Sequence, residues 1–326
     1  MNHQDIDIHA ARLVDLPMLT RLVERSAILD MELACTRDAG IPQNLLLERI
    51  PLSQRELYTL VGRADRLPIA GQFRLKSDSP IARVVYIAPA LDENQADSVY
   101  LHLLDAMIAE AGRRGAHALT AEVDEFAPLF VTMRTAGFAV YARQQLWGRA
   151  PSRDLPAHIS PAPLEPARDE DAGDIQALYC NIVPKLVQPV GMTHPDTGFV
   201  YRKPGKRGIQ GYIAASEGKN GIFLLPLLHP DILFAEAAAI IAGAMMRFKS
   251  LDRVPIYICV RRYQDWLEET LIDLGFEPGR QQAVMVRHIA VGIRHATFAP
   301  VRHALETVQL APPTSRVHEV EFSSDF

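Results

Sequence analysis

Two short polar clusters in the second half of the chain carry groups that could do chemistry. His229 follows one apolar run, and Arg261, Arg262 and Tyr263 follow another. An imidazole can take up a proton near neutral pH, and paired guanidinium groups can hold phosphate oxygens. Because each cluster ends an apolar run, we expect the four residues to converge on one rim of a sheet. His229 and Tyr263 are the catalytic candidates, and Arg261 and Arg262 are the ligand-binding candidates.

Each cluster also has a simpler structural explanation. His229 precedes Pro230, so its ring could instead cap backbone groups where the strand ends. The two arginines could instead form a solvated strand end that pairs with Asp265 or Glu268. Both explanations remain open from the sequence.

The stretch at 202–211, which reads Arg-Lys-Pro-Gly-Lys-Arg-Gly-Ile-Gln-Gly, is basic and rich in glycine. A phosphate-binding loop of this kind needs a helix directly after it. The residues at 212–215 form a strand pattern instead. We therefore predict a charged loop between two strands, which could still reach an acidic partner or a phosphate at the mouth of a cleft.

Composition limits the class of protein. The chain has 326 residues, of which 48% are hydrophobic and 22% charged, which indicates about two packed domains. Its formal net charge of −5 argues against a dedicated nucleic-acid binder. Cys35, Cys180 and Cys259 lie far apart, so they indicate neither a disulfide framework nor a zinc site. We expect a reduced, cytoplasmic protein without a metal.

Neither a secretory signal nor a membrane span is expected. The first residues lack the basic and then apolar pattern of a signal peptide. The apolar stretch at 222–246 is long enough to cross a bilayer, but Pro230, Asp231 and Glu236 interrupt it. Two shorter buried elements explain this stretch better than a membrane helix does.

A proline-rich stretch near the middle of the chain predicts a domain boundary, since its prolines can continue neither a helix nor a central strand. We predict an N-terminal domain at 1–149, a linker at 150–163, a C-terminal domain at 164–296 and a polar extension at 297–326.

The two halves share features in the same order, which suggests an internal duplication of about 140 residues. In each half an acidic residue is placed to cap the first helix, a short helix closes on Gly-Phe, and Arg-Gln-Gln follows. The matching positions are Asp15 and Asp171, 136–138 and 274–276, and 143–145 and 280–282.

Strands lead each half and then alternate with helices, which predicts an α/β fold with a mixed, mostly antiparallel sheet flanked by helices. The predicted strands lie at 6–13, 57–63, 69–76, 82–87, 118–123, 139–147, 212–215, 222–227 and 256–260, and the helices at 96–114, 129–136, 234–248 and 264–274. The helix at 234–248 is apolar nearly all round, so we expect the other half or a second subunit to bury it.

Several of these features together resemble the GNAT superfamily of N-acetyltransferases. They are the acidic start of helix one, a fourth strand ending in proline at 85–89, a long helix ending at Arg113-Arg114-Gly115, and the short helix before Gly-Phe. They occur over nearly the whole chain, so it resembles a tandem GNAT protein. The resemblance implies that acetyl-CoA binds in a V-shaped opening between strands four and five, where Leu228 ends strand four of the second half. It also implies direct attack of an amine on the thioester.

The sequence departs from the family pattern at two places in each half. The loop that should cradle the pyrophosphate reads 92–97 in the first half and 231–238 in the second, without glycine or a basic residue. The tyrosine that protonates the leaving thiolate in many members is replaced by Met133 and Leu271.

Two functions follow from this pattern. One is an acyltransferase that uses acetyl-CoA and acts on a small-molecule or peptide amine, with its active site in the second half. The alternative is a pseudoenzyme that binds a ligand or a protein. A third interpretation, a partner-binding surface, depends on exposure of the helix at 234–248. A homodimer is compatible with all three.

Overall fold

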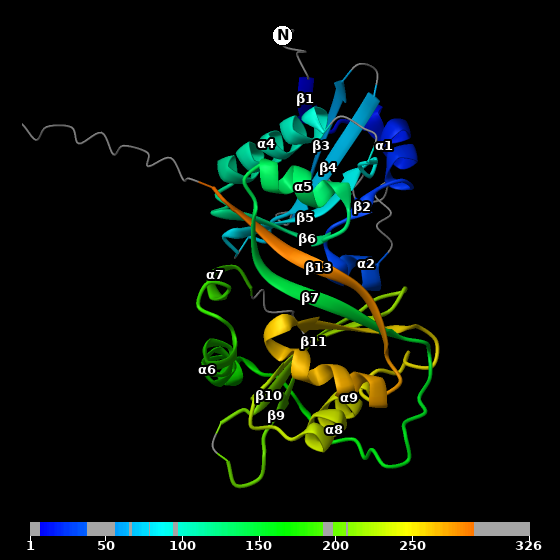
Figure 1. Cartoon of the computed structure of the whole chain (residues 1–326), viewed down its shortest axis with the longest axis vertical. Helices are drawn as coiled ribbons and strands as arrows, with labels where there is room; N and C mark the ends of the chain where they lie inside the picture. Colours follow the sequence, from blue (N-terminus) through cyan, green and yellow to red (C-terminus); the bar gives the residue numbers. More distant parts are fainter. Residues whose placement is uncertain are drawn as a thin grey trace, which may run out of the picture. The chain divides into compact units, whose positions relative to one another are not determined.

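The computed structural model describes residues 7–37, 56–64, 67–77, 79–93, 97–191, 198–206 and 208–289, all within one compact unit. The predicted extension at 297–326 lies outside the described residues, and the four domain ranges remain a prediction. The described strands form one mixed 13-stranded sheet with helices on it, which confirms the predicted α/β class (Figure 1).

The first half contributes β1 (Asp7–Ala10), α1 (Leu16–Val23), β2 (Ala27–Ile28), α2 (Met31–Thr36), β3 (Leu57–Ala64), β4 (Leu67–Arg74), β5 (Ile81–Ala88), α4 (Ser98–Arg113), β6 (Ala118–Asp124), α5 (Pro128–Thr135) and β7 (Ala139–Arg149). The second half contributes β8 (Glu165–Pro166), α6 (Ala172–Ile182), α7 (Gln188–Gly191), β9 (Gly198–Tyr201), β10 (Gly211–Glu217), β11 (Ile222–Leu228), α8 (Phe234–Met245), β12 (Ile256–Arg261), the 3-10 helix η3 (Arg262–Leu267), α9 (Glu268–Asp273) and β13 (Glu277–His288). Two further 3-10 turns, η1 (Leu13–Asp15) and η2 (Asp169–Asp171), precede α1 and α6.

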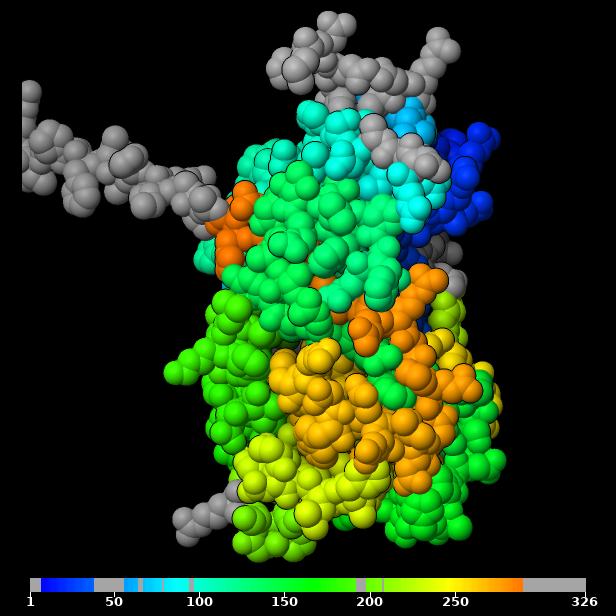
Figure 2. Space-filling model, viewed as in Figure 1, coloured from blue at the N-terminus to red at the C-terminus, as the bar shows by residue number. Residues whose placement is uncertain are grey.

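The last strand of each half pairs with a strand of the other half. β13 pairs with β6 from Gln282↔Asp124 to His288↔Ala118, and β7 pairs with β12 from Ile256↔Arg149 to Arg261↔Gln144. β7 and β13 also pair with each other and cross the middle of the molecule side by side (Figure 1). In the space-filling view, the orange end of β13 lies against the cyan and green surface of the first half (Figure 2). The two halves therefore share one continuous sheet.

Both halves begin with the same turn, but the acidic residue caps it differently from our prediction. Asp15 does not accept a hydrogen bond from the following helix; its carboxylate accepts one from the backbone N–H of Arg12 at 2.8 Å. Asp171 accepts in the same way from Arg168 at 2.9 Å. Each carboxylate thus holds the chain before the 3-10 turn, as the acidic residue of a capping box does.

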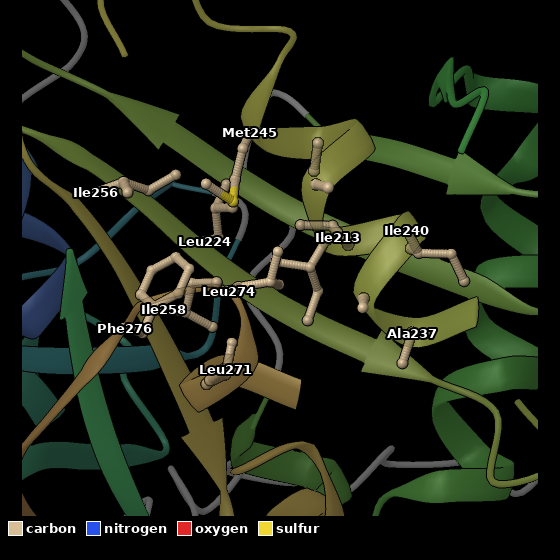
Figure 3. Packing of buried hydrophobic residues seen from close by; sticks show 14 of the residues in the cluster. Ile213, Leu224, Ala237, Ile240, Met245, Ile256, Ile258, Leu271, Leu274 and Phe276 are labelled. Carbon is tan, nitrogen blue, oxygen red and sulfur yellow. The ribbon is translucent and has the colours of Figure 1, made fainter. Parts of the chain in front are cut away.

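The apolar helix α8 is buried within its own half, and this corrects the expectation that the other half or a second subunit covers it. Its side chains pack with strands β10 to β12 and with α9 (Figure 3). The proline-rich linker closes the remaining side, where Ile159 and Leu164 join the same core and the Ala162 N–H donates to Ala239 O at 2.8 Å. The partner-surface interpretation therefore loses its basis.

Gly243 in α8 shows how tightly the linker packs. A Cβ at Gly243 would lie 2.3 Å from the carbonyl oxygen of Ala162. Alanine in a helix interior usually stabilises relative to glycine by about 1 kcal/mol. At this position we expect Gly243→Ala to lower the free energy of unfolding by about 2 kcal/mol, because the backbone of the linker must move.

Urea unfolding of the purified variant tests this prediction. Gly173→Ala in α6 is the matched control, because a Cβ there meets nothing within 4 Å. The control should be neutral or stabilising. A Gly243→Ala variant as stable as the wild type would show that the linker does not hold the described position.

A short helix from each half packs on the sheet of the other half. Met31 and Cys35 of α2 join a cluster with Phe223 of β11 and Cys259 of β12. In the reverse direction, α7 packs through Val190 against β6 and β13. The α2 helix thereby brings polar residues of the first half over the second-half sheet.

Candidate active site

Each half contains a pair of parallel strands whose pairing ends part of the way along. β5 and β6 pair from Ile81↔Ala118 to Arg83↔Thr120, and β11 and β12 pair from Ile222↔Ile256 to Leu224↔Ile258. Both strands of each pair continue beyond the last paired position. The sheet therefore opens once in each half, between the strands where the family resemblance places acetyl-CoA.

The chain itself fills the opening in the first half. β2 pairs with β5, and the following residue, Leu29, joins both walls of the opening. Its N–H donates to Val85 O at 2.8 Å, and its carbonyl oxygen accepts from the Glu122 N–H at 2.9 Å. A backbone segment thus occupies the edge that a pantetheine chain would need.

The opening in the second half has no such segment. Among the described residues, no strand pairs with β11 or β12 inside it. The Ile222 N–H donates to Pro255 O, so the backbone N–H positions of Ile222 and of every second residue after it point toward β12. Pro226 is one of these residues, and it has no N–H to donate. No described strand lies beside it that would need this N–H. At the far end, Gln264 Nε2 donates to Leu228 O at 2.9 Å. This side-chain hydrogen bond links the end of β11 to η3.

A pocket adjoins the second-half opening and is lined by residues of both halves. It encloses about 470 Å³ of empty space, including its open mouth. Leu225 on its wall is the first β11 residue beyond the last pair with β12. The charged and polar residues that line it are Glu32 of α2, Arg83 of β5, Glu122 of β6, Ser216 of β10 and Arg261 of β12. We call it the junction pocket.

Arg261 and Glu122 form an ion pair across the junction pocket. Arg261 Nη2 lies 3.4 Å from Glu122 Oε1, and their side chains are 12% and 17% exposed. The other carboxylate oxygen, Glu122 Oε2, accepts from the Met31 N–H at 2.9 Å. Arg261 Nη1 is buried and has no hydrogen-bond partner among the residues that the structure describes. The guanidinium is therefore only partly satisfied.

Glu32 is the second carboxylate of the junction pocket. Its Oε1 accepts from the Ser216 hydroxyl at 2.6 Å, and its Oε2 lies 3.4 Å from Arg74 and 3.9 Å from Arg83. Burial by itself raises the pKa of Glu32, but the Ser216 hydrogen bond and the two arginines outweigh it and lower the pKa. Glu32 is thus held as a carboxylate.

The lowered pKa of Glu32 predicts a pH-dependent contribution to stability. An acid with a depressed folded-state pKa stabilises the protein above its unfolded pKa, near 4.5, and loses that contribution as pH falls through the folded value. We expect Glu32→Gln to be less stable than the wild type at pH 7 and the difference to shrink steadily below pH 4.5. Urea midpoints of both proteins across this range measure it. A difference that does not vary with pH would contradict the prediction.

Tyr263 lies beside the junction pocket at the start of η3. Burial raises the pKa of Tyr263, and nearby Arg261 lowers it only in part. Tyr179 of α6 is the second phenol beside Arg261, and burial raises the pKa of Tyr179 as well. Both phenols are therefore protonated at neutral pH, and the Tyr179 hydroxyl donates to Gln188 O at 3.1 Å.

His229 does not line the junction pocket. Its Nδ1 accepts from the Asp231 N–H at 3.2 Å, and its Nε2 lies 3.1 Å from Asn181 Nδ2. This is the capping arrangement that the sequence left as the alternative. A catalytic role for His229 remains a prediction.

The other two ligand-binding candidates are Leu228 and Arg262. Leu228 is buried, and Arg262 is exposed at the start of η3. Neither side chain lines the junction pocket. Of the predicted residues, the structure brings Arg261 and Tyr263 together.

The basic stretch at 202–211 joins β9 to β10, as predicted. Two of its charges are paired: Arg202 Nη1 lies 2.8 Å from Glu165, and Lys203 Nζ lies 2.6 Å from Glu236 in the first turn of α8. Lys203 is thus the basic residue placed beside the start of α8.

Sequence reasoning missed Glu32 and Glu122. Glu122 and Arg83 are single charged residues inside apolar strands, and such residues are rarely buried unless they are paired or functional. The sequence therefore contained a signal for Glu122. It contained no signal for Glu32, because the packing of α2 on the opposite half is not visible in the residues around Glu32.

Neither a metal-binding cluster nor a membrane-spanning helix is found among the described residues. No group of three or more His, Cys, Asp and Glu side chains among them could hold a metal ion. No helix among them is both long and apolar enough to cross a membrane.

Comparison with solved structures finds the same fold at low sequence identity. A GCN5-related N-acetyltransferase from Sphaerobacter thermophilus matches 89% of this chain and 97% of its own, with a TM-score of 0.55 and 10% identity. A tandem GNAT protein from the clavulanic acid biosynthesis pathway matches 87% of this chain and 99% of its own, with a TM-score of 0.50 and 14% identity. No family model and no curated protein matches the sequence. The predicted architecture is thereby confirmed: the chain folds as two GNAT-like domains in tandem.

Proposed function

We propose that the protein is a GNAT-type acyltransferase with one working site, formed by the second-half opening and the junction pocket. The observation that carries this proposal is the difference between the two openings. Leu29 bridges β5 and β6 in the first half, whereas no described strand lies between β11 and β12 where they separate. Acetyl-CoA, the cosubstrate, supplies the acyl thioester.

The residues of the junction pocket suit the acceptor side of this reaction. The amine nitrogen bonds to the acyl carbon, the carbon–sulfur bond breaks, and the amine loses a proton. Glu122 is the base that we propose, because its Oε1 has only a loose contact with Arg261. Tyr263, a neutral phenol beside Arg261, would return a proton to the leaving thiolate.

The fit of the second half to coenzyme A is incomplete around the phosphates. The start of α8 offers backbone N–H groups to a phosphate, and Lys203 lies beside it. Glu236 in the same turn places a negative charge there. We propose that Lys203 and the first turn of α8 hold the pyrophosphate in place of a glycine-rich loop.

The alternative function is a pseudoenzyme that binds a ligand without transferring an acyl group. Many members of the family have a tyrosine that acts as the general acid, and Met133 and Leu271 stand at those positions here. Both are fully buried core residues, of α5 and α9. This observation favours the alternative. Transfer activity therefore decides between the two functions.

Calorimetric titration with acetyl-CoA, followed by a thiol-release assay with a panel of amines, tests the proposal. We expect one site per chain and thiol release that depends on the amine. Lys203→Ala should bind several-fold more weakly, whereas the exposed Lys185→Ala should bind like the wild type. Binding without amine-dependent thiol release would favour the pseudoenzyme. No binding at about 1 mM would exclude the acyltransferase.

A further inference from the structure

The junction pocket is lined by equal numbers of positive and negative side chains. Glu32 and Glu122 contribute two carboxylates, and Arg83 and Arg261 contribute two guanidinium groups. A ligand with a single net charge would leave one unpaired charge in a partly buried site, which is costly. A ligand that carries one positive and one negative group keeps the balance.

Arg261 has hydrogen-bonding capacity left for an anion. Its Nη2 is 3.4 Å from Glu122, which is long for a charge-assisted hydrogen bond, and its Nη1 is buried without a partner. A ligand carboxylate could take both nitrogens in the two-pronged geometry that guanidinium groups favour. The negative end of the ligand therefore belongs on Arg261.

The positive end belongs on Glu122. Its Oε2 is already held by the Met31 N–H, which fixes the carboxylate, while its Oε1 has only the loose contact with Arg261. Glu32 Oε1 accepts from the Ser216 hydroxyl at 2.6 Å, and two guanidinium groups, Arg74 at 3.4 Å and Arg83 at 3.9 Å, already balance its charge. An ammonium group could thus replace Arg261 as the partner of Glu122 Oε1.

We propose that the junction pocket binds a free α-amino acid, with its carboxylate on Arg261 and its ammonium group on Glu122. The pocket opens to solvent at its mouth, where the side chain of the amino acid would lie. The inference rests on the proposed function in one respect: it names the amine that would receive the acyl group.

The test is a binding measurement without any acyl donor. The protein is titrated with each of the common L-amino acids, and then with the methyl ester and the N-acetyl derivative of every amino acid that binds. The ester lacks the carboxylate, and the acetylated form lacks the ammonium group. We expect at least one free amino acid to bind and both derivatives to bind at least about tenfold more weakly.

Variants locate the site. Glu122→Gln should weaken amino-acid binding at least about tenfold, whereas Asp124→Asn, on the same strand and paired with exposed Arg280, should not change it. Thermal melts of both variants show whether they are folded, and the derivative series tests the pocket without any substitution.

The outcomes separate the inference from the proposed function. Absence of amino-acid binding at about 10 mM, or an ester that binds as well as its free acid, would overturn the inference. Amino-acid binding without acyl transfer would support the inference and count against the proposed function. Acetyl-CoA-dependent transfer to amines that lack a carboxylate would do the reverse.

Discussion

Replacing Arg261 by alanine is expected to lower the free energy of unfolding by about 3 kcal/mol at neutral pH. Arg261 and Glu122 are 12% and 17% exposed, so the pair is largely shielded from water. Removal of the cation leaves the carboxylate of Glu122 in place with little but the Met31 N–H to stabilise it. Breaking one side of a buried ion pair is costly because the remaining charge stays buried. Urea unfolding at pH 7 measures the loss.

Arg262→Ala is the control, since Arg262 is the adjacent residue and is exposed. Its unfolding free energy should change by no more than about 0.5 kcal/mol. A double mutant should therefore be no less stable than Arg261→Ala alone, within error. If Arg261→Ala were as stable as the wild type, Glu122 would not depend on this ion pair, and the described geometry of the junction pocket would be wrong.

Glu122→Gln is expected to slow acyl transfer about a hundredfold or more, because general-base catalysis commonly contributes that much. Glutamine keeps an oxygen that can accept from the Met31 N–H, but it loses the ion pair with Arg261, so the rate is compared only after thermal melts show that the variant is folded. It cannot take up a proton from the attacking amine. Thiol release from acetyl-CoA, measured with the amine that reacts fastest in the wild type, gives the ratio of rates.

Glu125→Gln serves as the matched control for this experiment. Glu125 lies just after β6 and pairs with Arg143 at 2.7 Å, outside the junction pocket. Its rate should equal that of the wild type. Equal rates in Glu122→Gln and Glu125→Gln would remove Glu122 from the mechanism, provided that both variants melt like the wild type.

The local elements of the fold could be predicted from the sequence because their signals are local. The long helix α4 was expected at 96–114 and is observed at Ser98–Arg113, where its apolar face and its final arginines define it. The duplication was also visible, since the turns at η1 and η2 repeat the same spacing of arginine and aspartate. These features depend on neighbouring residues alone.

The exchange of strands between the halves could not be predicted in this way. β13 was missed as a strand, because its first residues, including Arg280 and Gln281, are polar and exposed. Nothing in an isolated strand says which partner it pairs with, and β13 pairs with β6, about 160 residues earlier in the chain. The junction pocket depends on that pairing and on α2. Its carboxylates were therefore not predicted from the sequence, whereas Arg261, which lies at a recognisable strand end, was predicted.

The filled opening of the first half is a feature of packing rather than of composition. Leu29 fills it through main-chain groups, and any residue with an N–H could make those two hydrogen bonds. The sequence showed only that the phosphate loop of the first half was acidic. The structure adds that a backbone segment already pairs with both strand edges there.

A crystal structure of the protein grown with acetyl-CoA tests the proposed site of the second half. We expect one bound molecule per chain, with its pantetheine chain between β11 and β12 and its thioester next to the junction pocket, and with Leu29 still hydrogen-bonded to Val85 and Glu122. Acetyl-CoA found between β5 and β6, with the segment around Leu29 displaced, would contradict it.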